Sequence, residues 1–251
     1  MKKNNQKVFL PQTLKPIDIQ EEKGYAEKDS LNNGIEEQQL ILRGEEIASL
    51  LRQKGLQSPI VNVQLEKERQ TKVEAIKYHF QKILQALELD TTDPGLHETP
   101  LRVAKLYVDE LCSGLNPDQF PKCTTFPMQE SSIVFQKDIP FSSLCMHHFL
   151  PFTGHVHIGY KSNGKILGLS KLNRVVNYFS RRPQVQELLN KQIYTVLQAI
   201  LDTEDVFVRI EGSHSCIHVR GVNQQGTKTI SQEAGGVFKD PVYLGQYFHK
   251  M

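Results

Sequence analysis

The tetrapeptide at residues 145–148, Cys-Met-His-His, limits what this chain can fold into more than any other stretch. A thiolate and an imidazole three residues apart can close on one metal ion from a tight turn, and that ligand mixture suits zinc. A second short element, His-Ser-Cys at 214–216, could supply a third ligand if the fold brings two distant segments together. Three protein ligands would leave the fourth zinc position open to water, which is the pattern of catalytic sites.

The same residues also allow a purely structural interpretation. Cys145 and Cys216 would then be small buried hydrophobic residues, and the nearby histidines would be hydrogen-bonded polar groups. Both interpretations stay open at this point, because cysteine packs well without any chemistry.

Composition indicates a globular chain with a polar appendage. The 251 residues suffice for one large domain, or for one of roughly 180 residues with an extension. The apolar fraction is 39% and the charged fraction 23%, as in ordinary globular proteins. Because the net charge is only +2, we expect neither nucleic acid nor an anionic membrane as a partner.

The four cysteines, at positions 112, 123, 145 and 216, show no disulfide framework. They favour a reduced, cytoplasmic setting. The N-terminus lacks the apolar segment of a secretory signal, and no run approaches the roughly 20 apolar residues that a membrane span needs.

The chain divides near residue 64. Residues 1–64 are rich in Lys, Gln, Asn and Glu, so we expect a mostly disordered extension. Within it, the apolar spacing of 45–54 indicates a short helix that could dock on the chain itself or on a partner. Residues 65–251 should form the folded domain, beginning with two helices over 67–113, of which the second has Thr99 as its N-cap and Pro100 at its first position.

The rest of the chain predicts strands and helices in mixed order. Strands are expected at 133–144, 154–160 and 206–210, and residues 166–169 should pair back on the second strand as a hairpin. Helices are expected from Ser170 as N-cap to about residue 181, and from Pro183 to about residue 200. Two helices between antiparallel strand pairs indicate an α+β layer structure with helices on one sheet face.

Three polar residues gather in the first turn of the helix that opens at Ser170. Lys171 and Arg174, together with Ser170 and the exposed N–H groups of the helix, would make a cradle for a polyphosphate. The alternative is a solvated basic turn, and cations there oppose the helix dipole unless an anion binds. Arg220 could bring a further guanidinium to the same ligand.

Gln186 and Glu187 place an amide and a carboxylate at the start of the next helix. A carboxylate accepts two N–H bonds side by side, which matches the ring N–H and amino group of guanine. The alternative is a first-turn Glu that favours the helix dipole.

Several short motifs in register extend these observations. They cover roughly residues 68–240 and resemble the GTP cyclohydrolase I family: Cys145-x-His147-His148, Pro151-Phe-x-Gly154, Gly168-Leu-Ser-Lys-Leu-Asn-Arg174, Arg182-Pro-Gln-Val-Gln-Glu187, His214-x-Cys216 and Arg220-Gly-Val222.

The resemblance implies the tunnelling fold for 128–240, an antiparallel sheet backed by helices, in a toroidal homodecamer of two pentameric rings. It implies that Cys145, His148 and Cys216 hold zinc, and that a bound water attacks C8 of GTP. His147 and His214 would be the acid/base pair. Formate would leave, and rearrangement of the ribose would give 7,8-dihydroneopterin triphosphate, the first step of folate and pterin biosynthesis.

The resemblance also implies a division of the substrate contacts. Glu187, helped by Gln186, would read guanine. The triphosphate would be held by Ser170, Lys171, Arg174 and Arg220.

One residue departs from the family pattern. The family normally has Glu where this chain has Met146. An apolar thioether then replaces a carboxylate beside the site, which bears on proton balance and rate. Glu233, from a later segment, is one carboxylate that could have taken over the role.

Two other functions fit the same residues. The first is a catalytically weakened paralogue that binds GTP, favoured only by Met146. The second is another tunnelling-fold enzyme on a purine or pterin, such as the nitrile reductase of deazaguanine metabolism. His148 and Cys216 argue against the reductase, because its chemistry needs no zinc triad.

Overall fold

The computed structural model describes residues 42–60 and 69–248. The expectation of disorder for residues 1–41 and 61–64 lies outside these described residues. Among the described helices, none is both long and apolar enough to cross a membrane.

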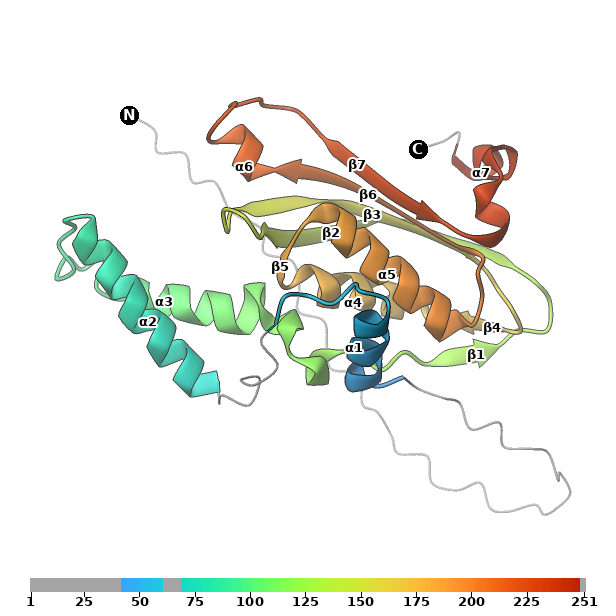
Figure 1. Cartoon of the computed structure of the whole chain (residues 1–251), viewed down its shortest axis with the longest axis horizontal. Coiled ribbons are helices and arrows are strands. Elements are labelled where there is room, and N and C mark those ends of the chain that lie inside the picture. The colour runs from blue at the N-terminus through green and yellow to red at the C-terminus, as the bar shows by residue number, and fades with distance from the viewer. Residues whose placement is uncertain (1–41, 61–68, 249–251) are drawn as a thin grey trace, which may run out of the picture. The chain divides into compact units, whose positions relative to one another are not determined.

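A five-stranded sheet with the order β5-β2-β3-β6-β7 forms the centre of the fold (Figure 1). Its long strands are β2 (Ile133–Cys145), β3 (Pro151–Lys161), β6 (Val206–His214) and β7 (Thr229–Ala234), and each neighbouring pair of them is antiparallel. The short β5 (Pro183–Gln184) runs parallel to the end of β2. The predicted α+β class with a mainly antiparallel sheet is confirmed.

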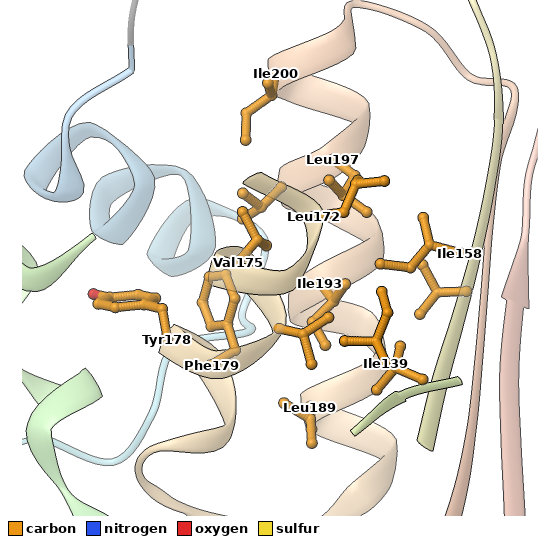
Figure 2. Close-up of a cluster of buried hydrophobic side chains, with 14 of the residues drawn as sticks. Ile139, Ile158, Leu172, Val175, Tyr178, Phe179, Leu189, Ile193, Leu197 and Ile200 are labelled. Carbon is orange, nitrogen blue, oxygen red and sulfur yellow. The ribbon is translucent and has the colours of Figure 1, made fainter. Parts of the chain in front are cut away.

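Two helices, α4 (Leu169–Ser180) and α5 (Gln186–Leu201), pack on one face of this sheet. Figure 2 shows their apolar side chains meeting those of the strands, with Ile139 and Ile158 facing Ile193 and Leu197 of α5. These residues are at most 4% exposed, so they belong to the hydrophobic core that fixes the helices on the sheet. The apolar spacing read from the sequence therefore identified the core-facing positions of α4 and α5, whereas in the helix predicted after residue 65 Ile83 and Leu87 are exposed.

Further elements precede and follow this core. Before it lie α2 (Arg69–Ala86), α3 (Thr99–Lys105), a π-helical turn (Leu106–Leu111) and two 3₁₀ turns (Ser113–Leu115 and Pro117–Gln119). Helix α2 packs against α3, which ends at Lys105 where the π-helical turn begins. After the core lie α6 (Ser215–His218), a 3₁₀ turn (Gly236–Lys239) and α7 (Pro241–Phe248).

The predicted hairpin after β3 is wrong. Strand β4 (Lys165–Leu167) pairs with β1 (Thr125–Pro127) in a separate two-stranded sheet, and not with β3. The turn at 162–164 thus leads the chain away from its own strand. Local alternation shows that a segment is extended, but it does not show which partner the segment finds.

Three predicted helix starts also differ. Helix α3 already includes Thr99, and its N-cap is Glu98. Gly168, not Ser170, is the N-cap of α4, so Ser170 lies inside the first turn. Pro183 lies in β5, and the next helix begins only at Gln186, because Gln184 pairs beside Cys145.

The structure differs from the expected extension over residues 42–60. Helix α1 (Gly44–Gln53), which the spacing predicted, buries Ile47 and Leu51 in the core. The following segment is tied down by hydrogen bonds from Gln192 Nε2 to the Leu56 carbonyl, at 2.7 Å, and from Arg182 Nη1 to Ser58 Oγ, at 3.2 Å. Two buried apolar residues are enough to dock so short a helix, although the average composition of 1–64 is polar.

Candidate metal centre and active site

Cys145 is the last residue of β2 and begins a tight turn. Its N–H donates to the Leu150 carbonyl at 2.8 Å, and its carbonyl accepts from the N–H of Phe149 at 2.8 Å. Phe149 has φ of 53°, a left-handed conformation that lets the chain reverse into β3. The Cys145 Sγ is thereby held 3.9 Å from His147 Nδ1 and 4.0 Å from His148 Nδ1, whereas both imidazoles are exposed.

Cys216 follows a different strand and lies at the same end of the sheet as this turn. It lies in α6 directly after β6, and the strand pairing places His214 opposite Phe152 at the same end of the sheet. The possible ligand atoms of Cys145, His148 and Cys216 all lie within 4.8 Å of one another. The fold therefore brings together the three residues that the sequence had suggested as ligands.

The donor set suits a soft divalent cation. Two thiolates and one imidazole match zinc, which takes Cys sulfur and His nitrogen with a tetrahedral preference. Burial raises the pKa of Cys216, and the hydrogen bond and charge of the Cys145 sulfur raise it further. Two sulfur atoms this close repel one another as thiolates, and a cation between them removes the repulsion.

Arg220 lies against one of the three possible ligands. Its Nη1 is 2.7 Å from His148 Nε2. A guanidinium can only donate, so His148 Nε2 accepts this hydrogen bond. The predicted phosphate-binding arginine and the predicted metal ligand are therefore in direct contact.

His214 is held more tightly than the other two histidines. Its ring stacks on Phe152 with centroids 4.6 Å apart and planes 3° from parallel, and its Nε2 is 2.9 Å from Gln186 Oε1. Burial lowers the pKa of His214, the Glu187 carboxylate opposes this shift and His218 adds to it. Neither the stacking on Phe152 nor the bond to Gln186 was predicted, because both depend on strand register and helix placement.

The Gln186 side chain is hydrogen-bonded within the protein at both ends of its amide. The side chain is buried, with 2% exposed, and Oε1 faces His214. Its Nε2 donates toward the Ile210 carbonyl, the Thr229 carbonyl and Ser231 Oγ at 3.0–3.2 Å. Both ends of the amide are thus used inside the protein. Glu187, the next residue, is exposed, because consecutive helix positions point in different directions.

The predicted phosphate cradle lies on the first turn of α4. Ser170 and Arg174 are exposed, and Lys171 is half-buried close to Cys123, where its charge opposes the burial that raises the pKa of that thiol to about 11. In the part of the chain that the structure describes, no hydrogen bond or ion pair joins this turn to Cys145, His148 or Cys216.

Met146 and Glu233 lie on different elements. The N–H of Met146 donates to the Gln184 carbonyl at 3.0 Å, directly after Cys145. Glu233 of β7 pairs with Val208 of β6, four residues beyond Thr229, which pairs with Gly212. At about 3.4 Å per residue, Glu233 is therefore roughly 14 Å along the strand from the end of β7 that pairs near His214.

Comparisons with known proteins show which family this chain is similar to. The family model described as GTP cyclohydrolase I matches residues 76–251. The protein named GTP cyclohydrolase 1 from Vibrio vulnificus is 42% identical over 206 residues, which cover 81% of this chain and 94% of that protein. The protein of the same name from Aeromonas salmonicida is 43% identical over 195 residues, covering 77% of this chain and 88% of the relative.

A third protein named GTP cyclohydrolase 1, from Flavobacterium johnsoniae, is 45% identical over 172 residues, covering 68% of this chain and 77% of the relative. Among solved structures, the apo form of the archaeosine synthase QueF-Like matches with a TM-score of 0.36 and 19% identity. The match covers 42% of this chain and 96% of that chain.

Proposed function

The chain belongs to the GTP cyclohydrolase I family and acts as a GTP cyclohydrolase I, and we propose how its residues divide that work. The reaction opens the imidazole ring of GTP at C8, releases formate and yields 7,8-dihydroneopterin triphosphate, which enters folate or another pterin pathway. The observation that carries the proposal is the convergence of Cys145, His148 and Cys216 beside His214.

Cys145, His148 and Cys216 would hold one zinc ion, because two thiolates and an imidazole suit this metal. When bound, zinc would supply an acidified water as the nucleophile near neutral pH. The two ligand thiols must remain reduced for this, which favours a reducing compartment such as the cytoplasm.

His214 and His147 move the protons. Attack at C8 is easier when the neighbouring ring nitrogen of the purine is protonated, and imidazole can give and take a proton near pH 7. His214 has a fixed ring, whereas His147 lies on the exposed turn. Their different surroundings suit a donor and an acceptor that work at different steps.

The Glu187 carboxylate recognises guanine by accepting two hydrogen bonds side by side, from the ring N–H and the amino group of the base. Ser170, Lys171, Arg174 and Arg220 bind the triphosphate. Arg220 would exchange its hydrogen bond with His148 for one with a phosphate oxygen, which is the stronger partner because it is charged.

The substrate site is completed between copies of the chain. Among the described residues, no hydrogen bond or ion pair joins the α4 turn to the candidate ligands, and a second copy that brings its own α4 turn would complete the site. Membership of the family supports the tunnelling fold with a toroidal homodecamer of two pentameric rings, in which residues 65–251 form the catalytic domain.

The competing function is a paralogue that binds GTP without turning it over. Met146 is the feature that favours it, because the family has a carboxylate at this position. The arrangement of His214 and the three ligands favours an active enzyme.

The test is the Cys216→Ser variant, measured for zinc content, GTP binding and formate release. We expect one zinc per chain in the wild type and loss of most of it in the variant, because a hydroxyl is a poor replacement for a thiolate on this metal. Cys112→Ser is the matched control, since Cys112 is free and lies outside the ligand group. Full zinc content in Cys216→Ser contradicts the ligand assignment, and tight GTP binding without formate release in the wild type favours the paralogue.

A further inference from the structure

The orientation of the Gln186 amide is fixed by its surroundings. The Nε2 lies 3.0 Å from the Thr229 carbonyl and 3.2 Å from the Ile210 carbonyl. A flipped amide would place its oxygen against two carbonyl oxygens, in a region where the side chain is only 2% exposed. The carbonyl oxygen of Gln186 must therefore face His214.

This orientation decides which nitrogen of His214 carries the hydrogen. Gln186 Oε1 can only accept, and it lies 2.9 Å from His214 Nε2, so Nε2 is the donor. In the neutral ring, Nδ1 is then the nitrogen with the free lone pair. The stacking on Phe152 fixes the plane of the ring, and the bond to Gln186 fixes its rotation in that plane.

Gly212 makes the contact sterically possible. It lies in β6 opposite Thr229, two residues before His214. A Cβ atom at this position would overlap Gln186 Oε1, and it would lie 3.4 Å from His214 Nε2. A larger residue would therefore displace the amide from the imidazole.

We propose that Gln186 is a positioning residue for the reaction: it holds His214 in one orientation and one tautomer, so that Nδ1 exchanges the proton with the substrate, and Gly212 provides the space for it. The inference rests on the proposed acid/base role of His214. It replaces the expectation that the Gln186 side chain reads guanine, and it leaves that contact to Glu187.

The two roles of Gln186 differ in what they do to kinetics. A guanine contact contributes to substrate affinity, so its loss raises KM or the Kd of GTP. A positioning contact acts on the chemical step, so its loss lowers kcat and leaves GTP affinity unchanged.

The first experiment compares Gln186→Met with Gln186→Glu in the full zinc-loaded chain. Met has a similar length but no acceptor, so we expect kcat to fall about 10- to 100-fold with KM within about threefold of wild type. Glu keeps an acceptor for His214 but places its second oxygen against the Ile210 and Thr229 carbonyls, so it should retain no more turnover than Met. Zinc content and the thermal unfolding midpoint are measured for each variant, because loss of metal would also lower kcat.

The second experiment disturbs the contact between Gln186 and His214 by a substitution at Gly212. Gly212→Ala should lower kcat by a similar factor, because the new methyl group displaces an intact Gln186. In a Gln186→Ala background the same substitution should have no further effect, since the group it would push is gone. A crystal structure of Gly212→Ala should show the His214 ring turned away from its wild-type orientation.

Asn190→Leu is the matched control. Asn190 Nδ2 donates to Ser231 Oγ at 3.1 Å, so this variant removes a buried amide beside Gln186 without touching His214. We expect its kcat to stay within about twofold of wild type.

The outcomes separate the inference from the function on which it rests. If His214→Ala keeps its turnover, the acid/base role itself fails. If His214→Ala is inactive but Gln186→Met has normal kcat, only the positioning role fails. A raised KM with normal kcat in Gln186→Met would mean that the Gln186 side chain contacts the substrate. A loss of kcat in Asn190→Leu equal to that in Gln186→Met would mean that both variants loosen the core.

Discussion

The inner and outer parts of the candidate site differ in where their partners come from. In the inner part, His214 has a stacking partner in Phe152 and a hydrogen-bond partner in Gln186. In the outer part, Ser170, Arg174, Glu187 and His147 are exposed. The fold alone orders the inner part, whereas the outer part offers charges and donors that a ligand or a second copy must organise.

This difference predicts two kinds of variant. Changes in the inner part should act on the chemical step or on stability, because those side chains are already paired before substrate arrives. Changes in the outer part should act on substrate affinity and should depend on ionic strength, because exposed charges are screened by salt. The following variants test this separation, from the largest expected effect to the smallest.

His214→Ala should give the largest loss of turnover among these variants. Removal of an acid/base group typically costs about 10²- to 10⁴-fold in kcat, and GTP affinity and zinc content should stay near wild type. His155→Ala is the control, since His155 is an exposed histidine in the same sheet. A large rise in KM with an unchanged kcat would mean that the inner part binds substrate and does no chemistry.

Arg174→Ala and Lys171→Ala should weaken GTP far more than guanosine. Each charge-assisted contact is worth about 1.5–3 kcal/mol, or roughly 10- to 150-fold in affinity. Arg181→Ala is a control at the other end of α4, where Arg181 Nε donates to Asn177 Oδ1 at 3.2 Å. Equal losses for GTP and guanosine would show that this turn serves structure and would break the comparison.

Met146→Glu tests whether a carboxylate beside Cys145, where the inner and outer parts of the site meet, raises turnover. A carboxylate restored beside Cys145 should raise turnover by about 10-fold, the low end for a charge-assisted hydrogen bond, with zinc content unchanged. Glu233→Gln should leave turnover unchanged, because Glu233 lies at the far end of β7. A slower Met146→Glu with normal zinc would mean that a carboxylate already serves the site and that a second one repels it.

The sequence predicted the elements and the grouping of the three candidate ligands better than it predicted their partners. The Cys and His residues at 145–148 and 214–216 stand out in the sequence, the family resemblance selects Cys145, His148 and Cys216 among them, and the structure brings these three together. The helices were found because apolar spacing is local. The partner of β4, the strand at Pro183 and the turn of Gln186 toward His214 depend on residues distant in sequence, about which a local pattern says nothing.

The same limit explains the buried segment near the N-terminus. Residues 42–60 are polar on average, yet Ile47 and Leu51 are 1% and 3% exposed. Composition averages over a window, whereas docking depends on two side chains that face one way on α1. The helical spacing of apolar residues predicted this helix, but the average composition of residues 1–64 did not show that the helix belongs to the core.

The smallest expected effect is a pH dependence of stability that comes from His157, an inner residue of the sheet without a role in the reaction. Its side chain is 7% exposed, and its Nδ1 accepts from the N–H of Asp138 at 3.2 Å. Burial lowers the pKa of His157 and the charges of Arg209 and His155 add to this, while Asp138 and Glu211 oppose it. In the unfolded chain the His157 imidazole has a pKa near 6.5, so it binds the proton more readily than in the folded chain. The contribution of His157 to stability is therefore present above about pH 6.5 and is lost as the pH falls toward the lowered pKa.

His157→Gln keeps an acceptor for Asp138 but cannot titrate, so its urea midpoint should fall less than that of the wild type between pH 7.5 and pH 5.5, at equal protein and zinc concentrations. His155→Gln, an exposed neighbour, should follow the wild type. If His157→Gln loses as much stability on acidification as the wild type, the acid sensitivity of the protein comes from other groups, and the buried histidine of the sheet is not held neutral by its surroundings.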